Sequence, residues 1–127
     1  MISKQRAARL GALAFVVAGF ATPACAEDVT GNWLRDTGAS KVRFSKCGDA
    51  LCGNISWLKE SGPAKVGERV FFDMKPSGDN QWRGSAFNPE DGKTYTGKMT
   101  LSGSTLTTSG CVLGGLICKS VTWTRSN

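Results

Sequence analysis

The chain has 127 residues, with 16 Lys and Arg against 10 Asp and Glu, 16 glycines, five cysteines and no histidine. This length fits one globular domain, and a hydrophobic content of 40% with 20% charged residues is typical of a folded protein. Without histidine, neither a Ser-His-Asp nor a Cys-His catalytic arrangement can form, and the common histidine-based metal sites are excluded.

Residues 1–26 have the three parts of a secretory signal peptide. Three cations among the first nine residues precede an apolar or small-residue run over residues 10–20, and residues 24–26 read Ala-Cys-Ala, the small-x-small form of a cleavage site. A membrane-spanning helix is the alternative, but eleven residues at about 1.5 Å each fall far short of a hydrocarbon core of about 30 Å. Lipid attachment at Cys25 is a second alternative, which the lack of the usual aliphatic residue before it disfavours.

Removal of this leader leaves a single exported domain of residues 27–127. The three leader cations are lost with it, so the domain carries 13 Lys and Arg against 10 Asp and Glu, a net charge of +3. Nucleic-acid-binding domains usually have a stronger and more clustered positive charge, so a nucleic acid is not an expected partner. No later apolar run is long enough for a transmembrane segment.

The exported domain keeps four cysteines, and this even number predicts two disulfides in an oxidising setting. Three connectivities are possible. We expect the local one, Cys47 to Cys52 and Cys111 to Cys118, because each pair brackets a glycine-containing turn. A redox-active dithiol would favour Cys-x-x-Cys spacing, which neither pair has, and zinc held by four thiolates is disfavoured in an exported protein.

Beyond the leader, apolar residues alternate with period two in short segments, which is typical of strands. We expect about eight strands, at residues 31–35, 41–45, 51–58, 69–74, 81–87, 94–101, 105–111 and 118–125. Turn-forming residues separate them, including those at 61–63, 75–79 and 88–92. In the third strand the alternation places Gly53, Ile55 and Trp57 together on the inward face.

Eight antiparallel strands joined by short hairpins remove their exposed edges when they close into a barrel. We therefore expect an all-β domain, a small up-and-down barrel, with a two-sheet sandwich as the alternative and no helix required. A barrel of this size is just wide enough to be filled by side chains or to hold one small ligand. The sequence leaves both interiors open.

Aromatic residues are the candidate ligand-binding residues. Four tryptophans fall one per strand, and core packing accounts for them because each large ring fills barrel volume. Glycines on the same face leave space beside the rings, so the lining of a cavity is the functional alternative. The candidates at one mouth of the barrel are Trp33, Trp57, Trp82 and Tyr95, with Trp123 expected inward in the last strand.

No other motif points to a chemical site. A calcium loop that began at Asn88 would need a glutamate where the chain has Met99. The carboxylates are too scattered for an acid and base pair, and no phosphate-binding glycine loop is present, so we expect no catalytic residue, metal or cofactor. Lys41, Arg43 and Lys46 form an outward basic row that is either a solvated strand face or a surface that attracts anions.

Four segments together resemble a known protein family. They are Lys-Val-Arg-Phe at 41–44, Cys-Gly-Asp-Ala-Leu-Cys-Gly-Asn-Ile-Ser-Trp-Leu at 47–58, Asn-Pro-Glu-Asp-Gly-Lys-Thr-Tyr at 88–95 and Trp-Thr-Arg at 123–125. The chain resembles the domain-of-unknown-function 2147 family of exported bacterial proteins. The resemblance implies a periplasmic or secreted bacterial protein with a lipocalin-like or calycin-like barrel, and it carries over no activity and no catalytic residues.

These observations favour a non-enzymatic exported barrel that binds a small apolar or amphipathic ligand in the cell envelope. The alternative is a structural or interaction protein of the envelope, with a filled core and an outer surface that contacts a protein partner. An enzyme is not expected, because acid, base and nucleophile cannot be assembled from these residues without histidine.

Overall fold

The computed structural model describes residues 28–127, so the predicted signal peptide lies outside the described residues. Short alternating segments form strands over most of this length, as expected for residues that bury one face of a pleated sheet. The strands are β3 (Gly31–Arg35), β4 (Ser40–Cys47), β5 (Ala50–Leu58), β6 (Arg69–Gly78), β7 (Gln81–Asn88), β8 (Lys93–Ser102), β9 (Thr105–Val112) and β10 (Ile117–Ser126).

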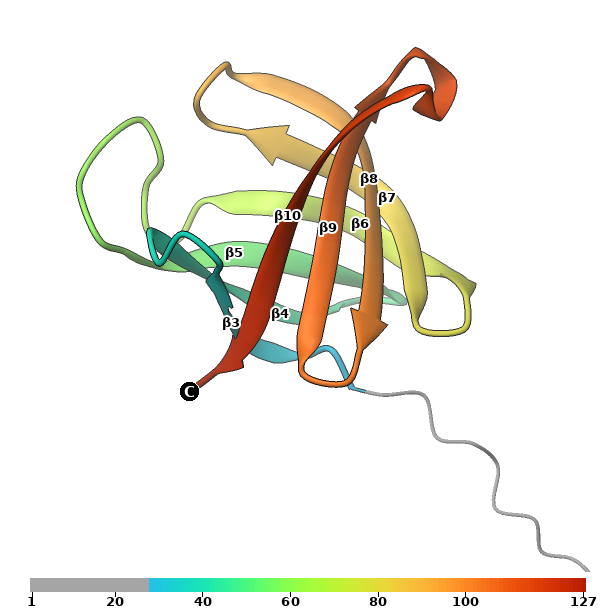
Figure 1. The fold of residues 1–127 in the computed structure, drawn as a ribbon, viewed down its shortest axis with the longest axis horizontal. Coiled ribbons are helices and arrows are strands. Elements are labelled where there is room, and N and C mark those ends of the chain that lie inside the picture. Colours follow the sequence, from blue (N-terminus) through green and yellow to red (C-terminus); the bar gives the residue numbers. More distant parts are fainter. Residues whose placement is uncertain (1–27) are drawn as a thin grey trace, which may run out of the picture.

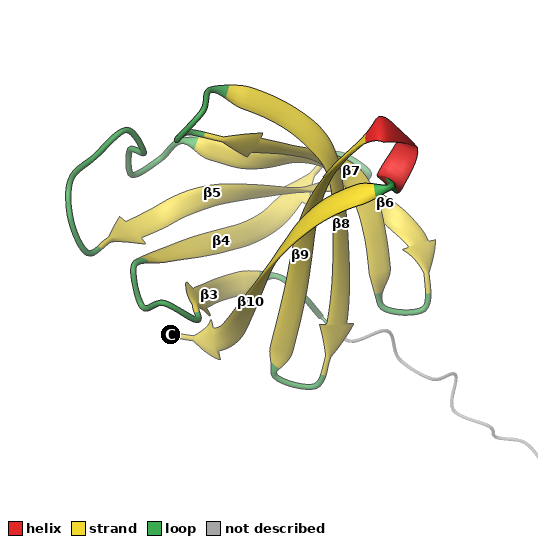
Figure 2. Ribbon diagram, turned by 45° about the horizontal axis from the view of Figure 1, so that its top comes forward, coloured by secondary structure: helices red, strands yellow, loops and turns green. Residues whose placement is uncertain are grey.

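Each strand pairs antiparallel with the next along the chain, and β10 pairs with β3 to close a barrel (Figure 1). Figure 2 shows the strands wrapped around one axis, with hairpin loops at both ends and a single turn of 3-10 helix, η3 (Leu113–Gly115), between β9 and β10. The expected barrel is therefore confirmed, and the two-sheet sandwich is wrong. Among residues 28–127, no helix has the length and apolar character needed to cross a membrane.

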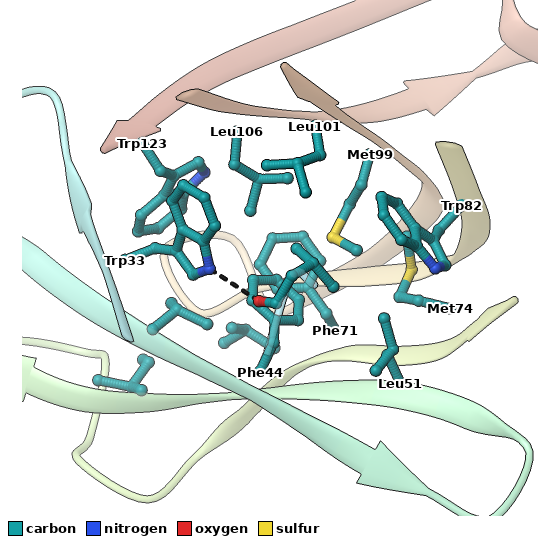
Figure 3. Close-up of a cluster of buried hydrophobic side chains, with 14 residues drawn as sticks. Trp33, Phe44, Leu51, Phe71, Met74, Trp82, Met99, Leu101, Leu106 and Trp123 are labelled. Atoms are coloured by element: carbon teal, nitrogen blue, oxygen red, sulfur yellow. Dashed lines mark hydrogen bonds between the residues drawn. The ribbon is translucent and has the colours of Figure 1, made fainter. Parts of the chain in front are cut away.

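One half of the barrel is filled by large side chains, which we call the filled half. Trp33, Met74 and Leu106 have no exposed surface there. Burial of each such side chain contributes about 1.5–3 kcal/mol, so this half supplies most of the apolar stabilisation. Figure 3 shows how the side chains converge from opposite walls; the set comprises Val29, Trp33, Phe44, Leu51, Met74, Trp82, Met99, Leu101 and Leu106.

Trp57 lies on the outer surface, so the expectation that it faces inward is wrong. Lys41 pairs with Trp57, but the next residue of β4, Val42, pairs with Ile55, which leaves one extra residue in β5. A bulge of one residue reverses the inward and outward alternation beyond it. Ile55 and Leu58 therefore face the interior, whereas the Trp57 side chain is 41% exposed, with the Lys41 ammonium 5.9 Å from its ring centre.

Strand β6 is longer than the sequence predicts. The turn expected at residues 75–79 is wrong, because β6 continues to Gly78, with Pro76 opposite Trp82, and the chain reverses at Asp79 and Asn80. Proline is tolerated in a strand where the ladder of hydrogen bonds is already interrupted. The register of β6 against β7 shifts on both sides of Pro76, which meets that condition.

A bulge brings the backbone of β6 directly over Gly84 of β7. Between Phe72 and Lys75, β6 has one residue more than the opposing segment of β7, and Asp73 adopts a φ of 50°. A Cβ on Gly84 would lie 2.4 Å from the carbonyl oxygen of Phe72 and 2.5 Å from that of Asp73. Glycine is therefore required at this crossing, because any side chain would displace backbone atoms of β6.

Arg125 of the last strand ties down the beginning of the barrel. Its guanidinium carbon lies 4.2 Å from the ring centre of Trp33, within the range of a cation–π contact. Its two terminal nitrogens donate to the carbonyls of Thr30, at 2.7 Å, and Asp28, at 2.5 Å. The indole nitrogen of Trp33 donates in turn to the carbonyl of Val29 at 2.9 Å, the dashed contact in Figure 3. These contacts seal the end of the filled half.

The local disulfide pairing predicted from the sequence is confirmed. Cys47 and Cys52 join β4 to β5 next to their turn, with their Cα atoms 5.8 Å apart. Cys111 and Cys118 lie directly opposite each other on β9 and β10, with a Cα separation of 4.1 Å. Each of these four sulfurs is held in a bridge, so none of them is a thiolate ligand for zinc.

Candidate cavity at the open end of the barrel

A cavity of about 1090 Å³ occupies the other half of the barrel and opens to solvent. It lies where β3, β5, β7 and β9 end and where β4, β6, β8 and β10 begin. The loop at residues 59–68, green in Figure 1, and the turns at 36–39 and 89–92 border its mouth. The volume lies slightly above the usual range for small-molecule pockets, about 300–1000 Å³.

This half is hollow because its inward positions carry smaller side chains than those of the filled half. Where β4 contributes Phe44 to the filled half, it contributes Val42 to the cavity. On β8 and β9, Met99 and Leu106 belong to the filled half, whereas Thr108 and Gly110 line the cavity. The apolar wall is completed by Ile55, Leu58, Val70, Phe71, Ala86, Val121 and Trp123.

Trp123 is the tryptophan that borders the cavity. Its indole nitrogen donates to the hydroxyl of Thr108 at 2.9 Å, and both side chains are almost fully buried. A buried indole N–H needs such a partner, and the bond fixes the position of the ring. The cavity therefore has a rigid aromatic group in its wall, held by a residue of the neighbouring strand.

Two cations occupy positions on the inner face of this half. Arg35 is opposite Trp123 in the ladder between β3 and β10, so both side chains lie on the inward face. Lys119 precedes Trp123 by four residues on β10 and pairs with Gly110, which places it on the same face nearer the mouth. The Nε atom of Arg35 is buried and has no hydrogen-bond partner among the described residues.

The turn between β7 and β8 is held by its own side chains. The Tyr95 hydroxyl donates to the carboxylate of Asp91, which also accepts from the backbone nitrogen of Lys93. The hydrogen bond from Tyr95 is the main cause that lowers the pKa of Asp91, and the same bond raises the pKa of Tyr95. Both groups are at the solvent-exposed rim, where they give the mouth a defined shape.

The four residues proposed as a ligand site do not meet at one mouth. Tyr95 lines the cavity, but Trp33 lies in the filled half beneath Arg125. Trp82 borders a smaller pocket of about 210 Å³ at the opposite end, and Trp57 is on the outer surface. The structure therefore places only one of the four at the large cavity.

Two cavity residues were not among the candidates from the sequence, although alternation carried a signal for both. Arg35 follows Trp33 by two positions, so an inward Trp33 predicts an inward Arg35 at the end of the strand. Trp123 was expected inward as part of the core. The alternation does not reveal the register between β3 and β10, and it is this register that places Trp123 and Arg35 opposite each other.

An apolar tip projects from the rim between β9 and β10, and we define it as residues 112–117. Its aliphatic side chains are exposed, with Leu113 at 68% and Leu116 at 85%. Val112 and Ile117 belong both to this tip and to the lining of the cavity mouth. The Cys111–Cys118 bridge closes its base, so the tip is a covalently bounded loop.

The fold and the cavity define a class: a small disulfide-linked antiparallel barrel, half filled by its core and half hollow. Residues 31–125 match the model of the family described as "Uncharacterized protein conserved in bacteria (DUF2147)", and the chain belongs to this family. No curated protein matches the chain, and no solved structure matches it either.

Proposed function

We propose that the protein binds a small apolar or amphipathic molecule in the open half of its barrel, and that it does so in the bacterial cell envelope without catalysing a reaction. The observation that carries this proposal is the division of the interior. A barrel that served only as a stable scaffold would gain from filling both halves, because each empty volume forfeits packing energy. This one keeps about 1090 Å³ with a mainly apolar lining.

Export is supported by the two disulfides together with the leader pattern. Structural disulfides persist in oxidising compartments such as the periplasm and are rare in the cytosol. Both bridges join neighbouring strands, where they hold turns of the barrel. We therefore place the protein in the periplasm or outside the cell.

A binding role without catalysis is supported by the chemistry at the cavity. The chain has no histidine, and the hydroxyl of Thr108 accepts a hydrogen bond from Trp123 rather than facing a base. Tyr95 and Asp91 are paired with each other at the exposed rim. Nothing in this arrangement activates a nucleophile by an adjacent base.

The test is to occlude the cavity and measure binding of an uncharged apolar fluorophore, N-phenyl-1-naphthylamine. Ala86 is an inward residue of the cavity wall, so Ala86→Trp fills part of the space. Thr100→Trp adds the same indole on the exposed face of β8 and is the matched control. We expect saturable binding to the wild type and to Thr100→Trp, and at least tenfold weaker binding to Ala86→Trp. Absence of saturable binding to the wild type, or equal binding to both variants, contradicts the proposal.

Native mass spectrometry of protein purified from its own cells provides a second readout. A noncovalent small molecule that co-purifies with the wild type and is absent from Ala86→Trp would support occupation of the cavity. A molecule retained equally by Ala86→Trp would place the binding elsewhere on the protein.

A second candidate function uses the outer surface. Trp57, exposed beside Lys41 and on the same outer face as Arg43, is the observation that favours it. Lys46, expected in the same outward row, instead lies on the inward face of β4 beside the smaller pocket. An exposed aromatic ring next to cations suits contact with an anionic partner in the envelope. Sedimentation with anionic vesicles that is lost in a Lys41→Glu, Arg43→Glu double variant would support this candidate, and unchanged sedimentation would contradict it.

A further inference from the structure

Both charged side chains on the inner face of the half of the barrel that holds the cavity are positive. Arg35 and Lys119 occupy inward positions and line the cavity. Asp73 is the single carboxylate within a described strand, and it is exposed at the β6 bulge rather than turned inward. The other carboxylates at the cavity, such as Glu60 and Glu90, belong to the loops around the mouth.

Arg35 is held in a way that leaves hydrogen-bonding capacity unused. Its Nε is shielded from solvent without an acceptor in the part of the chain that the structure describes. A buried donor without a partner lowers the stability of the fold, because the hydrogen bonds it made with water are lost, and the loss is larger when the group is charged. The inward neighbour across the ladder is Trp123, whose one polar side-chain atom is an indole N–H that donates to Thr108, so Trp123 offers Arg35 no acceptor.

We infer that Arg35 is the recognition site for an oxyanion carried on an apolar chain, a carboxylate or a phosphate monoester, with Lys119 as a second cation nearer the mouth. This inference rests on the proposed function, because the apolar chain is what the aliphatic wall of the cavity would hold. The planar guanidinium of Arg35 suits both oxyanions, since its donors match two oxygens at once. Val42, Ile55 and Phe71 offer the apolar surface for the chain.

The alternative hypothesis is that the carboxylates around the mouth favour a cationic ligand. Glu60, Glu90 and Asp91 border the opening, but Asp91 already accepts hydrogen bonds from Tyr95 and the backbone of Lys93. These groups are exposed to water, which weakens their interaction with a ligand charge. The inward and partly buried charge is positive, so an anionic ligand has the larger expected gain.

The experiment compares four ligands with a twelve-carbon chain at pH 8, each below its micelle concentration or solubility limit: dodecanoate, dodecyl phosphate, dodecanol and dodecyltrimethylammonium. Their dissociation constants are measured by displacement of N-phenyl-1-naphthylamine. We expect the wild type to bind one or both anions about tenfold to a hundredfold more tightly than dodecanol, as a charge-assisted hydrogen bond predicts. The dissociation constants of dodecanoate and dodecyl phosphate then show whether the site prefers a carboxylate or a phosphate monoester.

Variants test whether Arg35 carries the preference. Arg35→Gln should bring anion binding down to the level of dodecanol while dodecanol binding stays within about twofold. Arg43→Gln removes the same charge from the outer face of β4 and should retain the preference. Lys119→Gln, at the exposed mouth, should reduce anion affinity by a smaller factor. It supplies a second variant if Arg35→Gln does not fold.

Two outcomes separate this inference from the proposed function. Dodecanol binding with no anion preference in the wild type, or a preference that folded Arg35→Gln retains, overturns the oxyanion site and leaves the apolar cavity in place. If Arg35→Gln does not fold, an anion affinity unchanged in Lys119→Gln overturns it. Tighter binding of dodecyltrimethylammonium overturns it in the same way. Binding of none of the four ligands overturns the proposed function and the oxyanion site together.

Discussion

Substitution of Gly84 by alanine should destabilise the barrel strongly, although it adds only one methyl group. The added Cβ would meet the carbonyl oxygens of Phe72 and Asp73 at 2.4 and 2.5 Å, where ordinary van der Waals contact begins near 3.4 Å. The backbone of β6 or β7 must therefore shift by about 1 Å. That shift would strain the hydrogen-bonded ladder on both sides of the bulge.

The size of the effect follows from the kind of atom displaced. Overpacking typically costs about 1–3 kcal/mol, and flexible side chains account for the cheaper cases. Here the obstructing atoms are backbone, so we expect a loss of about 3 kcal/mol, a large share of the stability of a domain of this size. Such a loss lowers the melting temperature by about 12–24 °C.

The assay is urea unfolding of the oxidised protein, followed by tryptophan fluorescence and fitted to a two-state transition. Gly62→Ala is the matched control, because Gly62 lies in the loop between β5 and β6 and a Cβ there meets no atom within 4 Å. We expect the control to change stability by less than about 1 kcal/mol. A Gly84→Ala variant as stable as the Gly62→Ala control would refute the close approach of β6 to Gly84.

Two further substitutions test contacts at the ends of the barrel. Arg125→Gln removes the stacking on Trp33 and the hydrogen bonds to the carbonyls of Thr30 and Asp28, so urea unfolding should show a loss of stability of about 1–2 kcal/mol. Arg83→Gln, on the exposed face of β7, is the control and should change stability by less than about 0.5 kcal/mol. Equal effects of the two substitutions would contradict the role of Arg125. Tyr95→Phe removes the hydrogen bond that depresses the pKa of Asp91, so that pKa should rise toward its ordinary value of 3.8 in an NMR titration. The stability supplied by the depressed pKa is present above about pH 3.8 and is lost as the pH falls through the folded-state pKa, so the variant should lose less stability over that interval. An unchanged pKa would show that the bond is absent in solution.

Most of the fold could be predicted from the sequence because alternation and turn residues agree with each other. Strand β8 illustrates this: Tyr95, Gly97, Met99 and Leu101 alternate over its whole length and all face inward or line the cavity. The failures occur where a bulge breaks the period of two. The sequence predicts an inward Trp57, because the extra residue in β5 leaves no mark on the local pattern. The bulge is visible only in the pairing of β5 with β4.

The candidate site was harder to predict because a cavity depends on which inward residues share one end of the barrel. Trp33 and Trp82 are inward as expected, yet both belong to regions remote from the large cavity. Small residues such as Ala86 and Gly110 signal unfilled space only once the register brings them together. The free donor of Arg35 is likewise invisible in a sequence, since it depends on the absence of an acceptor on every strand nearby.

The separation of the interior into two halves has a consequence for how this protein tolerates change. Side chains with no exposed surface, such as Trp33 and Leu106, lie in the filled half, whereas selectivity would reside in the partly exposed wall positions of the cavity. Replacing Ala86 or Val121, which are only partly buried, with another side chain of modest size would alter what the barrel can hold at a small cost in stability. The same barrel could therefore acquire new ligands by a few substitutions in the cavity wall, while the filled half stays unchanged.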